Sequence, residues 1–253
     1  MAEGTRFAGR TAIVTGAASG IGRATALRLA ADGAAVACLD QDDRREDTAA
    51  SIGAAGGTAV AIRVDVRDPE SVTTAVDAAI EALGPCRVLA NIAGVLRFAR
   101  THEQPVEDWD LVRDVNLKGT FLMARAVIPS MLAEGGGAIV NVSSTAGVFG
   151  QAYNAAYCAS KGGVSLLSRA LAVEYINDGI RVNAIAPGGV ATPMTNRVDF
   201  PEGMDFDLIT KTMAQGNKML DPTEPASLIA YLASDEAPGI NGAVIPIDHA
   251  VTA

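Results

Sequence analysis

Short apolar segments alternate with helical segments along almost the entire chain, and this alternation restricts the possible folds more than any other feature. The segments that fit buried strands are 11–15, 34–40, 58–66, 86–94, 138–144, 180–187 and 242–248. Helical patterns lie between them, and two long ones cover 105–134 and the region from Tyr157 to about Asn177. Strands separated by helices require right-handed crossovers, which make the strands parallel. We therefore expect one α/β domain over residues 1–253, with a doubly wound, Rossmann-like parallel sheet of about seven strands and helices on both faces.

The charge of the chain restricts its partners. The formal net charge is −9, with 29 acidic and 20 basic residues. Nucleic acids and anionic membranes require a basic surface, so neither is expected as a partner. The uncharged stretch 135–160 is long enough to span a membrane, but it contains Asn141, Ser143 and Gln151. These polar residues suit a buried site better than lipid.

The cysteines and the N-terminus indicate a cytoplasmic protein. Cys38, Cys86 and Cys158 are scattered and odd in number, and they form no C-x-x-C pair. Such a pattern is typical of reduced thiols in the cytosol. The first ten residues, MAEGTRFAGR, contain no apolar segment of the kind found in a signal peptide.

A glycine-rich turn separates the first expected strand from its helix. The sequence TGAASGIG at 15–22 places Gly16, Gly20 and Gly22 around Ser19 and Ile21. Residues without Cβ allow a tight turn and close approach to a pyrophosphate, and the following helix N-terminus supplies free N–H groups. The spacing predicts a dinucleotide site, although a glycine turn without a ligand has the same composition.

An acidic residue ends the second expected strand. Asp40 lies 18 residues after Gly22, near the expected spacing of about 20. A carboxylate there can bind both ribose hydroxyls of NAD and would repel the 2′-phosphate of NADP, so we expect NAD. Arg44 and Arg45 follow in a segment that we expect to be the solvated face of a helix.

A tyrosine and a lysine lie four residues apart in AAYCASKGG at 155–163. On a helix Tyr157 and Lys161 share a face, so the pair is either an ordinary helix contact or a means of lowering the pKa of a phenol. A fall of about three units costs about 4 kcal/mol. A cation at ~4 Å supplies about that much at an effective dielectric of ~20. We therefore expect Lys161 to lower the pKa of Tyr157.

Seven motifs, in order, resemble the short-chain dehydrogenase/reductase family over nearly the full length. They are TGAASGIG (15–22), DV (65–66), NIAG (91–94), VN (115–116), VSS (142–144), YCASK (157–161) and PGGVATPM (187–194). The resemblance implies an oxidoreductase that transfers a hydride between NAD(H) and a secondary alcohol or ketone. Isolated histidines His102 and His249 form no metal-binding set, and no metal is expected.

The resemblance also implies a role for each matching residue. Tyr157 would be the acid/base, Lys161 would bind the nicotinamide ribose and lower the phenol pKa, and Ser144 would bind the substrate oxygen. Asn116 would organise a water that links Lys161 to solvent. The other implied cofactor-binding residues are Gly16, Ser19, Gly20, Ile21, Gly22, Asp40, Asp65, Val66, Asn91, Gly94, Pro187, Val190 and Thr192.

The segment 192–219 is expected to form a lid over the substrate. Its flexible apolar residues are Met194, Phe200, Met204, Phe206, Met213 and Met219. They suit an adaptable apolar surface, although they could equally pack an insertion onto the core. We expect a moderately bulky, apolar substrate. A 3-oxoacyl-thioester reductase and a catalytically silent NAD(H)-binding sensor are the alternatives.

The resemblance finally implies a homotetramer, or a homodimer, formed through the helices at about 105–134 and 153–177. The chain departs from the family pattern at two places. Ile92 replaces an asparagine, and the usual Asp-Gly-Gly after the last strand reads Asp248-His249-Ala250. The second departure concerns a region that usually lies near a subunit interface.

Overall fold

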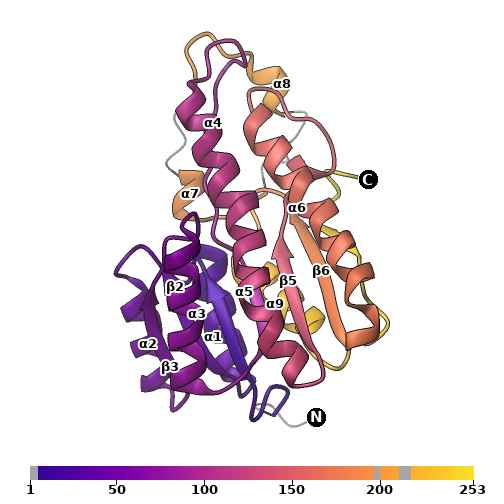
Figure 1. Cartoon of the computed structure of the whole chain (residues 1–253). Helices are drawn as coiled ribbons and strands as arrows, with labels where there is room; N and C mark the ends of the chain where they lie inside the picture. The colour runs from indigo at the N-terminus through magenta and orange to yellow at the C-terminus, as the bar shows by residue number, and fades with distance from the viewer. Residues whose placement is uncertain (1–4, 197–199, 211–217) are drawn as a thin grey trace.

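A seven-stranded parallel sheet forms the centre of the molecule (Figure 1). The computed structural model describes residues 5–196, 200–210 and 218–253. The strand order is β3-β2-β1-β4-β5-β6-β7. The strands are β1 (Thr11–Thr15), β2 (Ala35–Asp40), β3 (Thr58–Arg63), β4 (Cys86–Asn91), β5 (Gly137–Val142), β6 (Ile180–Pro187) and β7 (Val244–Ile247). The predicted doubly wound sheet is confirmed.

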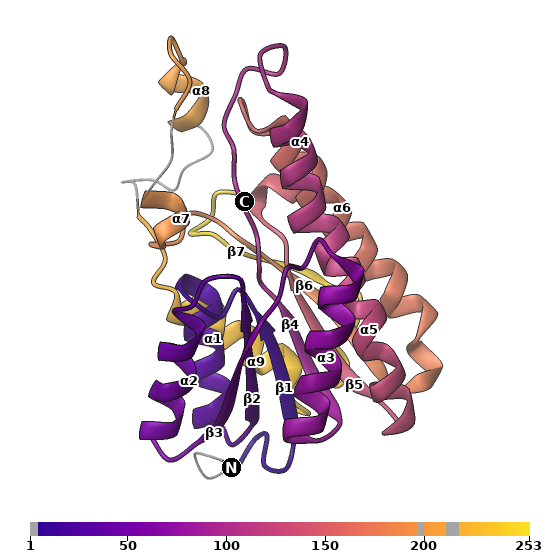
Figure 2. The same cartoon turned by 60° about the vertical axis from the view of Figure 1, so that its left-hand side comes forward.

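Helices cover both faces of this sheet (Figure 2). One face carries α1 (Gly20–Ala31), α2 (Arg45–Ala54) and α9 (Thr223–Ala233). The other carries α3 (Pro69–Leu83), α5 (Gly119–Ala133) and α6 (Ala155–Glu174). The short helices α4 (Val106–Arg113), α7 (Pro193–Asn196) and α8 (Phe206–Thr210) lie beyond the carboxyl ends of the strands.

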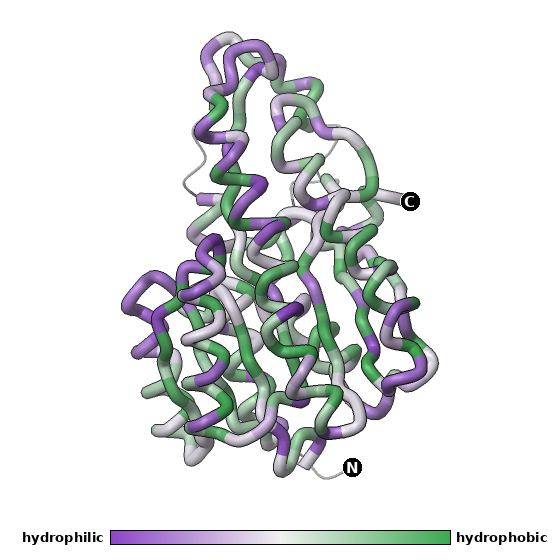
Figure 3. Tube along the Cα trace, in the orientation of Figure 1, coloured by the Kyte–Doolittle hydropathy of each residue, from purple (hydrophilic) through white to green (hydrophobic). Residues whose placement is uncertain are grey.

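Alternate residues of each strand face opposite layers. In β1, Ile13 packs against the α3, α5 and α6 layer, whereas its neighbour Val14 packs against the α1, α2 and α9 layer. Both side chains are completely buried. A sheet that is buried on both faces explains why its strands read as continuous apolar runs. Figure 3 shows these hydrophobic segments in the middle of the molecule and hydrophilic ones at the loop tips.

The sequence misplaced several boundaries and missed one helix. β3 ends at Arg63 and β4 at Asn91, each three residues earlier than expected, because the chain leaves the sheet there and forms loops that line a cleft. The expected helix at 105–134 is interrupted by a π-helical turn at Asp114–Lys118. Helix α9 was not predicted, because it lies directly after the irregular proline-containing region.

The turn after β7 contains His249 and Ala250 at the two positions where the family pattern has glycine. His249 and Ala250 both have left-handed backbone conformations, with φ of 52° and 65°. The Asp248 carboxylate holds them there by accepting hydrogen bonds from the backbone N–H of Ala250 and Thr252 and from the Thr252 hydroxyl, at 3.0, 3.0 and 2.6 Å. Side-chain bonds thus replace the conformational freedom of glycine.

Within the described ranges, no helix has the length and apolar character that crossing a membrane requires.

We predict that Ala250→Gly stabilises the protein. A left-handed non-glycine residue costs about 1–2 kcal/mol, while glycine loses about 0.5–1 kcal/mol more chain entropy on folding. The net gain of about 0.5–1 kcal/mol should raise Tm by about 1–3 °C in thermal unfolding. Ala50→Gly, on the exposed face of α2, is the matched control and should lower Tm. An equal loss for both variants would show that Ala250 is not strained.

Candidate active site

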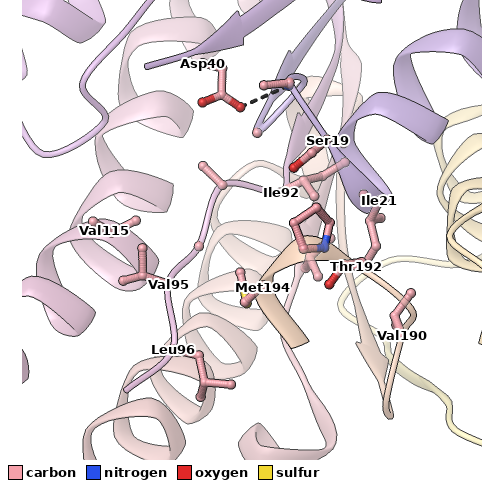
Figure 4. A pocket seen from close by; sticks show the side chains of 18 of the residues that line it. Ser19, Ile21, Asp40, Ile92, Val95, Leu96, Val115, Val190, Thr192 and Met194 are labelled. Atoms are coloured by element: carbon pink, nitrogen blue, oxygen red, sulfur yellow. Dashed lines mark hydrogen bonds between the residues drawn. The ribbon is translucent and has the colours of Figure 1, made fainter. Parts of the chain in front are cut away.

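One cleft of about 570 Å³ lies at the carboxyl edge of the sheet (Figure 4). The order of the strands reverses between β1 and β4, and open α/β sheets bind ligands where this reversal occurs. The expected site residues that line the cleft are Gly16, Ser19, Gly20, Ile21, Gly22, Asp40, Val66, Gly94, Ser144, Tyr157, Lys161, Pro187, Val190 and Thr192. Asp65, Asn91 and Asn116 do not line it.

The glycine turn is packed too closely for side chains. A Cβ on Gly22 would lie 2.0 Å from the backbone oxygen of Gly16, and one on Gly20 would lie 2.9 Å from the Thr192 side chain. Gly16 has a φ of 72°. The first turn of α1 has no side-chain cap and no acidic residue, so its N–H groups remain available to an anion. These features fit the pyrophosphate of a dinucleotide.

Asp40 is the last residue of β2 and lines this cleft. Its carboxylate accepts hydrogen bonds from the backbone N–H groups of Ala18 and Asp42, each at 3.0 Å. Figure 4 shows the bond to the glycine turn as a dashed line. Backbone N–H groups therefore hold both carboxylate oxygens and fix a negative charge at this end of the cleft.

Arg44 is exposed to solvent, as expected, and its side chain also lines the cleft. Its guanidinium forms an ion pair with Asp42 at 2.6 Å. Arg45 differs from the expectation, because its side chain is buried and pairs with Asp43 and Glu46.

Asp65 and Val66 lie beyond β3. Val66 is buried and lines the cleft, and Gly119 packs closely against it. Asp65 points elsewhere: its carboxylate binds the Arg67 guanidinium at 2.7–3.2 Å, and this hydrogen-bonded cation lowers the pKa of Asp65. The Asp65 carboxylate therefore orients Arg67, which does line the cleft and was not identified from the sequence.

Ser144, Tyr157 and Lys161 meet at the other end of the cleft. Ser144 follows β5, and the two other residues lie on one face of α6, as expected from their spacing. The Lys161 Nζ lies 5.7 Å from the centroid of the Tyr157 ring and donates a hydrogen bond to the Val142 oxygen at 2.7 Å. Lys161 is almost completely buried.

The pKa values of this pair differ from the expectation. Burial raises the pKa of the Tyr157 phenol to about 12, and a hydrogen bond with Ser144 opposes the shift only in part. Burial also lowers the pKa of the Lys161 ammonium to about 8. Desolvation thus outweighs the attraction between phenolate and ammonium in this structure, which disfavours both charged forms.

Asn116 lies in the π-helical turn, a feature often found at functional sites. Its side chain is completely buried and exchanges hydrogen bonds with the backbone of Val95 at 2.8 and 3.0 Å. It also donates to the Ser160 hydroxyl at 3.1 Å. A Cβ on Gly94 would lie 3.3 Å from the Asn116 Oδ1 and 3.6 Å from the Lys161 Nζ, so Gly94 leaves room beside both.

Asn91 lies outside the cleft and supports it through hydrogen bonds. Its amide donates to the Asn141 Oδ1 at 2.9 Å, and Asn141 in turn donates to the Ser168 hydroxyl at 2.8 Å. This buried chain of polar groups connects β4, β5 and α6. Asn91 is therefore placed to hold the sheet and the tyrosine-bearing helix together rather than to contact a ligand.

Residues 187–195 close the cleft on the side of α1. Thr195 donates a hydrogen bond to the Val190 oxygen at 2.7 Å, and the Thr192 N–H donates to the Thr195 hydroxyl at 3.1 Å. Thr195 was not identified from the sequence, and its spacing from the other motifs carries no signal. Leu96 and Met194 add apolar surface to the cleft.

Over the described part of the chain, no three His, Cys, Asp or Glu residues are grouped closely enough to hold a metal ion.

The chain is similar to known proteins over nearly its whole length. A family model described as enoyl-(acyl carrier protein) reductase matches residues 16–252. The 2,5-dichloro-2,5-cyclohexadiene-1,4-diol dehydrogenase of Sphingobium indicum is 41% identical over 96% of each chain. The cis-4-hydroxycyclohexanecarboxylate dehydrogenase of Sinomonas cyclohexanicum is 42% identical over 99% of each chain. A dehydrogenase/reductase from Sinorhizobium meliloti superposes with a TM-score of 0.87 and 34% identity, covering 97% of this chain and 96% of that one.

We predict that Gly22→Ala prevents dinucleotide binding. The added methyl group meets backbone at 2.0 Å and must displace the glycine turn. NADH binding, measured by fluorescence titration, should weaken at least tenfold while the protein remains folded by circular dichroism. Gly53→Ala is the control, because nothing lies within 4 Å of its Cβ. Unchanged NADH binding by the Gly22 variant would contradict the assignment of this turn.

Proposed function

Since the chain belongs to the short-chain dehydrogenase/reductase family and is an oxidoreductase that acts on alcohols, we propose that it transfers a hydride between NAD(H) and a secondary alcohol or ketone. The observation that carries this proposal is the arrangement of Ser144, Tyr157 and Lys161 in the same cleft as the glycine turn and Asp40.

We propose NAD as the cofactor. The glycine turn and the α1 N-terminus would hold its pyrophosphate, Asp40 its adenosine ribose, and Lys161 its nicotinamide ribose. The neighbouring Val66, Arg67 and Ile92 would border the adenine. When bound, the nicotinamide ring accepts or donates the hydride. Preference for NAD is supported by the fixed charge of Asp40 and by the pairing of Arg44 with Asp42.

The proton is handled by the chain itself. In the oxidation direction Tyr157, as phenolate, would take the hydroxyl proton of the substrate, and in the reduction direction the phenol would return it. Ser144 would hold the substrate oxygen beside Tyr157 and hydrogen-bonds with the phenol. Lys161, whose Nζ lies 5.7 Å from the centroid of the Tyr157 ring, would stabilise the phenolate.

Asn116 is proposed as the group that connects Lys161 to solvent through a water molecule. Its buried amide fixes the Val95 backbone, and Gly94 lies close to both the Asn116 Oδ1 and the Lys161 Nζ. These contacts support a role in which the Asn116 side chain positions the groups around Lys161 and does not contact the substrate.

We propose a cyclic or similarly bulky secondary alcohol as the substrate. Support comes from the six-membered rings in the names of the two relatives and from the apolar side chains of Leu96 and Met194, which line the same cleft as Ser144. Residues 192–219 are proposed as the lid of this single domain. Of its apolar residues, Met204 is buried, Phe200 and Phe206 are exposed, and Met213 lies outside the described residues.

A homotetramer and a cytoplasmic location complete the proposal. Apolar side chains exposed on α4, α5 and α6 include Trp109, Phe121 and Leu166, which is the surface expected at a subunit interface. Free Cys38, Cys86 and Cys158 are compatible with a reducing compartment.

We predict that Asp40→Ser reverses the cofactor preference. Removing the carboxylate deletes two ribose hydrogen bonds and the repulsion of a 2′-phosphate, and it leaves Arg44 in the cleft. NADH should bind about tenfold more weakly and NADPH more tightly in parallel fluorescence titrations. Asp43→Ser, whose carboxylate is exposed, should change neither affinity. NADPH preference in the wild type would overturn the assignment of Asp40 and would favour the 3-oxoacyl alternative.

We predict that Tyr157→Phe lowers turnover by about 10²–10⁴-fold, the usual contribution of a general acid or base. Binding of NADH should remain, since the ring is kept. In the wild type, alcohol oxidation should become faster as pH rises, because the phenolate form increases with pH, and the variant should lack this dependence. Retained turnover would exclude Tyr157 as the acid/base. Tight NADH binding by a wild type that oxidises no secondary alcohol would favour the sensor alternative.

A further inference from the structure

Three segments that lie far apart in the sequence meet beyond the carboxyl ends of the strands, and the first of them begins in the cleft with Val95, Leu96 and Arg97. They are residues 95–100 after β4, residues 149–154 before α6, and residues 200–206 before α8. Figures 1 and 2 both show α8 at the same end of the molecule as the beginnings of α4 and α6. Two side chains, Arg100 and Tyr153, make the polar contacts among these segments.

Arg100 connects the first segment to the third. Its Nη2 donates a hydrogen bond to the Gly203 oxygen at 2.8 Å. Its guanidinium carbon also lies 5.8 Å from the centroid of the Tyr153 ring, within the range of a cation–π contact. No acidic side chain in the described ranges forms a salt bridge with Arg100, so its contacts are directed to the loops.

Tyr153 connects all three segments. Its hydroxyl accepts a hydrogen bond from the Asp205 N–H at 3.0 Å, and its backbone oxygen accepts one from the Ala99 N–H at 3.0 Å. Its φ is 63°, an unusual value for a bulky residue. Such strain persists only where the surroundings enforce it, and it is concentrated at sites of function.

An aromatic cluster lies beside these contacts. The Phe98 and Phe200 rings are 5.3 Å apart, and Phe200 and Phe206 are 5.9 Å apart in an edge-to-face arrangement. Phe200 and Phe206 nevertheless remain 44% and 60% exposed. The cluster therefore presents apolar surface that the rest of the described chain does not cover.

We propose that Arg100 and Tyr153 form a latch that holds residues 200–206 over the substrate end of the cleft and so determines how large a substrate can bind. The inference rests on the proposed function for the location of the substrate. The latch binds the lid through two backbone groups, the Gly203 oxygen and the Asp205 N–H. The side chains of the lid are therefore available to contact the substrate. Both latch residues are positioning residues and perform no chemistry.

The latch is connected to the catalytic groups by short paths. Tyr153 precedes Tyr157 by four residues and lies next to the first turn of α6. Arg100 ends a loop whose beginning, at Val95, is held by Asn116. Opening the latch would thus widen the substrate end of the cleft without displacing the cofactor end, which is formed by β1, α1 and β2.

Hydrogen exchange tests the latch without requiring a substrate. Tyr153→Phe removes the hydroxyl and keeps the ring, whereas Arg100→Gln removes the guanidinium. Each loses about one net hydrogen bond, so the amides of 200–210 should exchange about three- to tenfold faster. Tyr231→Phe on α9 and Arg113→Gln on α4 are matched controls and should exchange like the wild type. Unchanged exchange in both latch variants would overturn the proposal.

Kinetics test the selection by size. For 4-tert-butylcyclohexanol, KM should change at least threefold in both latch variants, while KM for cyclohexanol and the Kd for NADH stay within twofold. Equal changes for both alcohols would contradict size selection and indicate a general structural effect. If the wild type oxidises neither alcohol, nor any other secondary alcohol, the proposed function and size selection both fail. The exchange result still decides whether the latch exists.

Discussion

Parallel pairing of all seven strands is the constraint on which the rest of the structure depends, because it brings every strand-to-helix loop to one edge of the sheet. The cleft residues Gly16, Asp40, Gly94, Ser144 and Pro187 are separated by up to 171 positions, yet each lies at or just after the end of a strand. Parallel pairing of the strands therefore brings the residues of the cleft together. The reversal of strand order between β1 and β4 then keeps neighbouring loops apart and leaves the space that the glycine turn borders.

The sequence predicted the fold and most of the cleft because both depend on local patterns. Buried strands require apolar runs, and the contact of Gly22 with the backbone of Gly16 requires glycine. Long-range contacts leave no such pattern. Nothing in the sequence indicates that Arg67 is oriented by Asp65, that Arg44 enters the cleft, or that Tyr153 meets Asp205. The same limit applies to Asn91 and Asn116, whose motifs were recognised but whose side chains hold other parts of the site in place.

Burial has opposite consequences for the cleft and for its acid/base group. Excluding water allows close packing around Ser144 and Lys161, yet it raises the pKa of Tyr157 to about 12 and lowers that of Lys161 to about 8. From the sequence, the proximity of the two charges was expected to dominate. In the structure, desolvation of the two side chains has the larger effect on both pKa values. The prediction failed because the spacing of the two residues does not reveal how deeply α6 is buried against β5.

The direction of this effect indicates when the tyrosine can act. Burial disfavours the phenolate, and the Lys161 Nζ, 5.7 Å from the centroid of the Tyr157 ring, is the positive charge that opposes it. A second positive charge in the cleft would lower the phenol pKa further. The oxidised nicotinamide carries such a charge, so the site that is proposed to bind NAD⁺ would make Tyr157 an effective base only after the cofactor has bound. Because Tyr157 and Lys161 are buried, the pKa of the phenol would then depend on whether the cofactor is bound. In a solvent-exposed pair, water would screen the charge of the cofactor and this dependence would be lost.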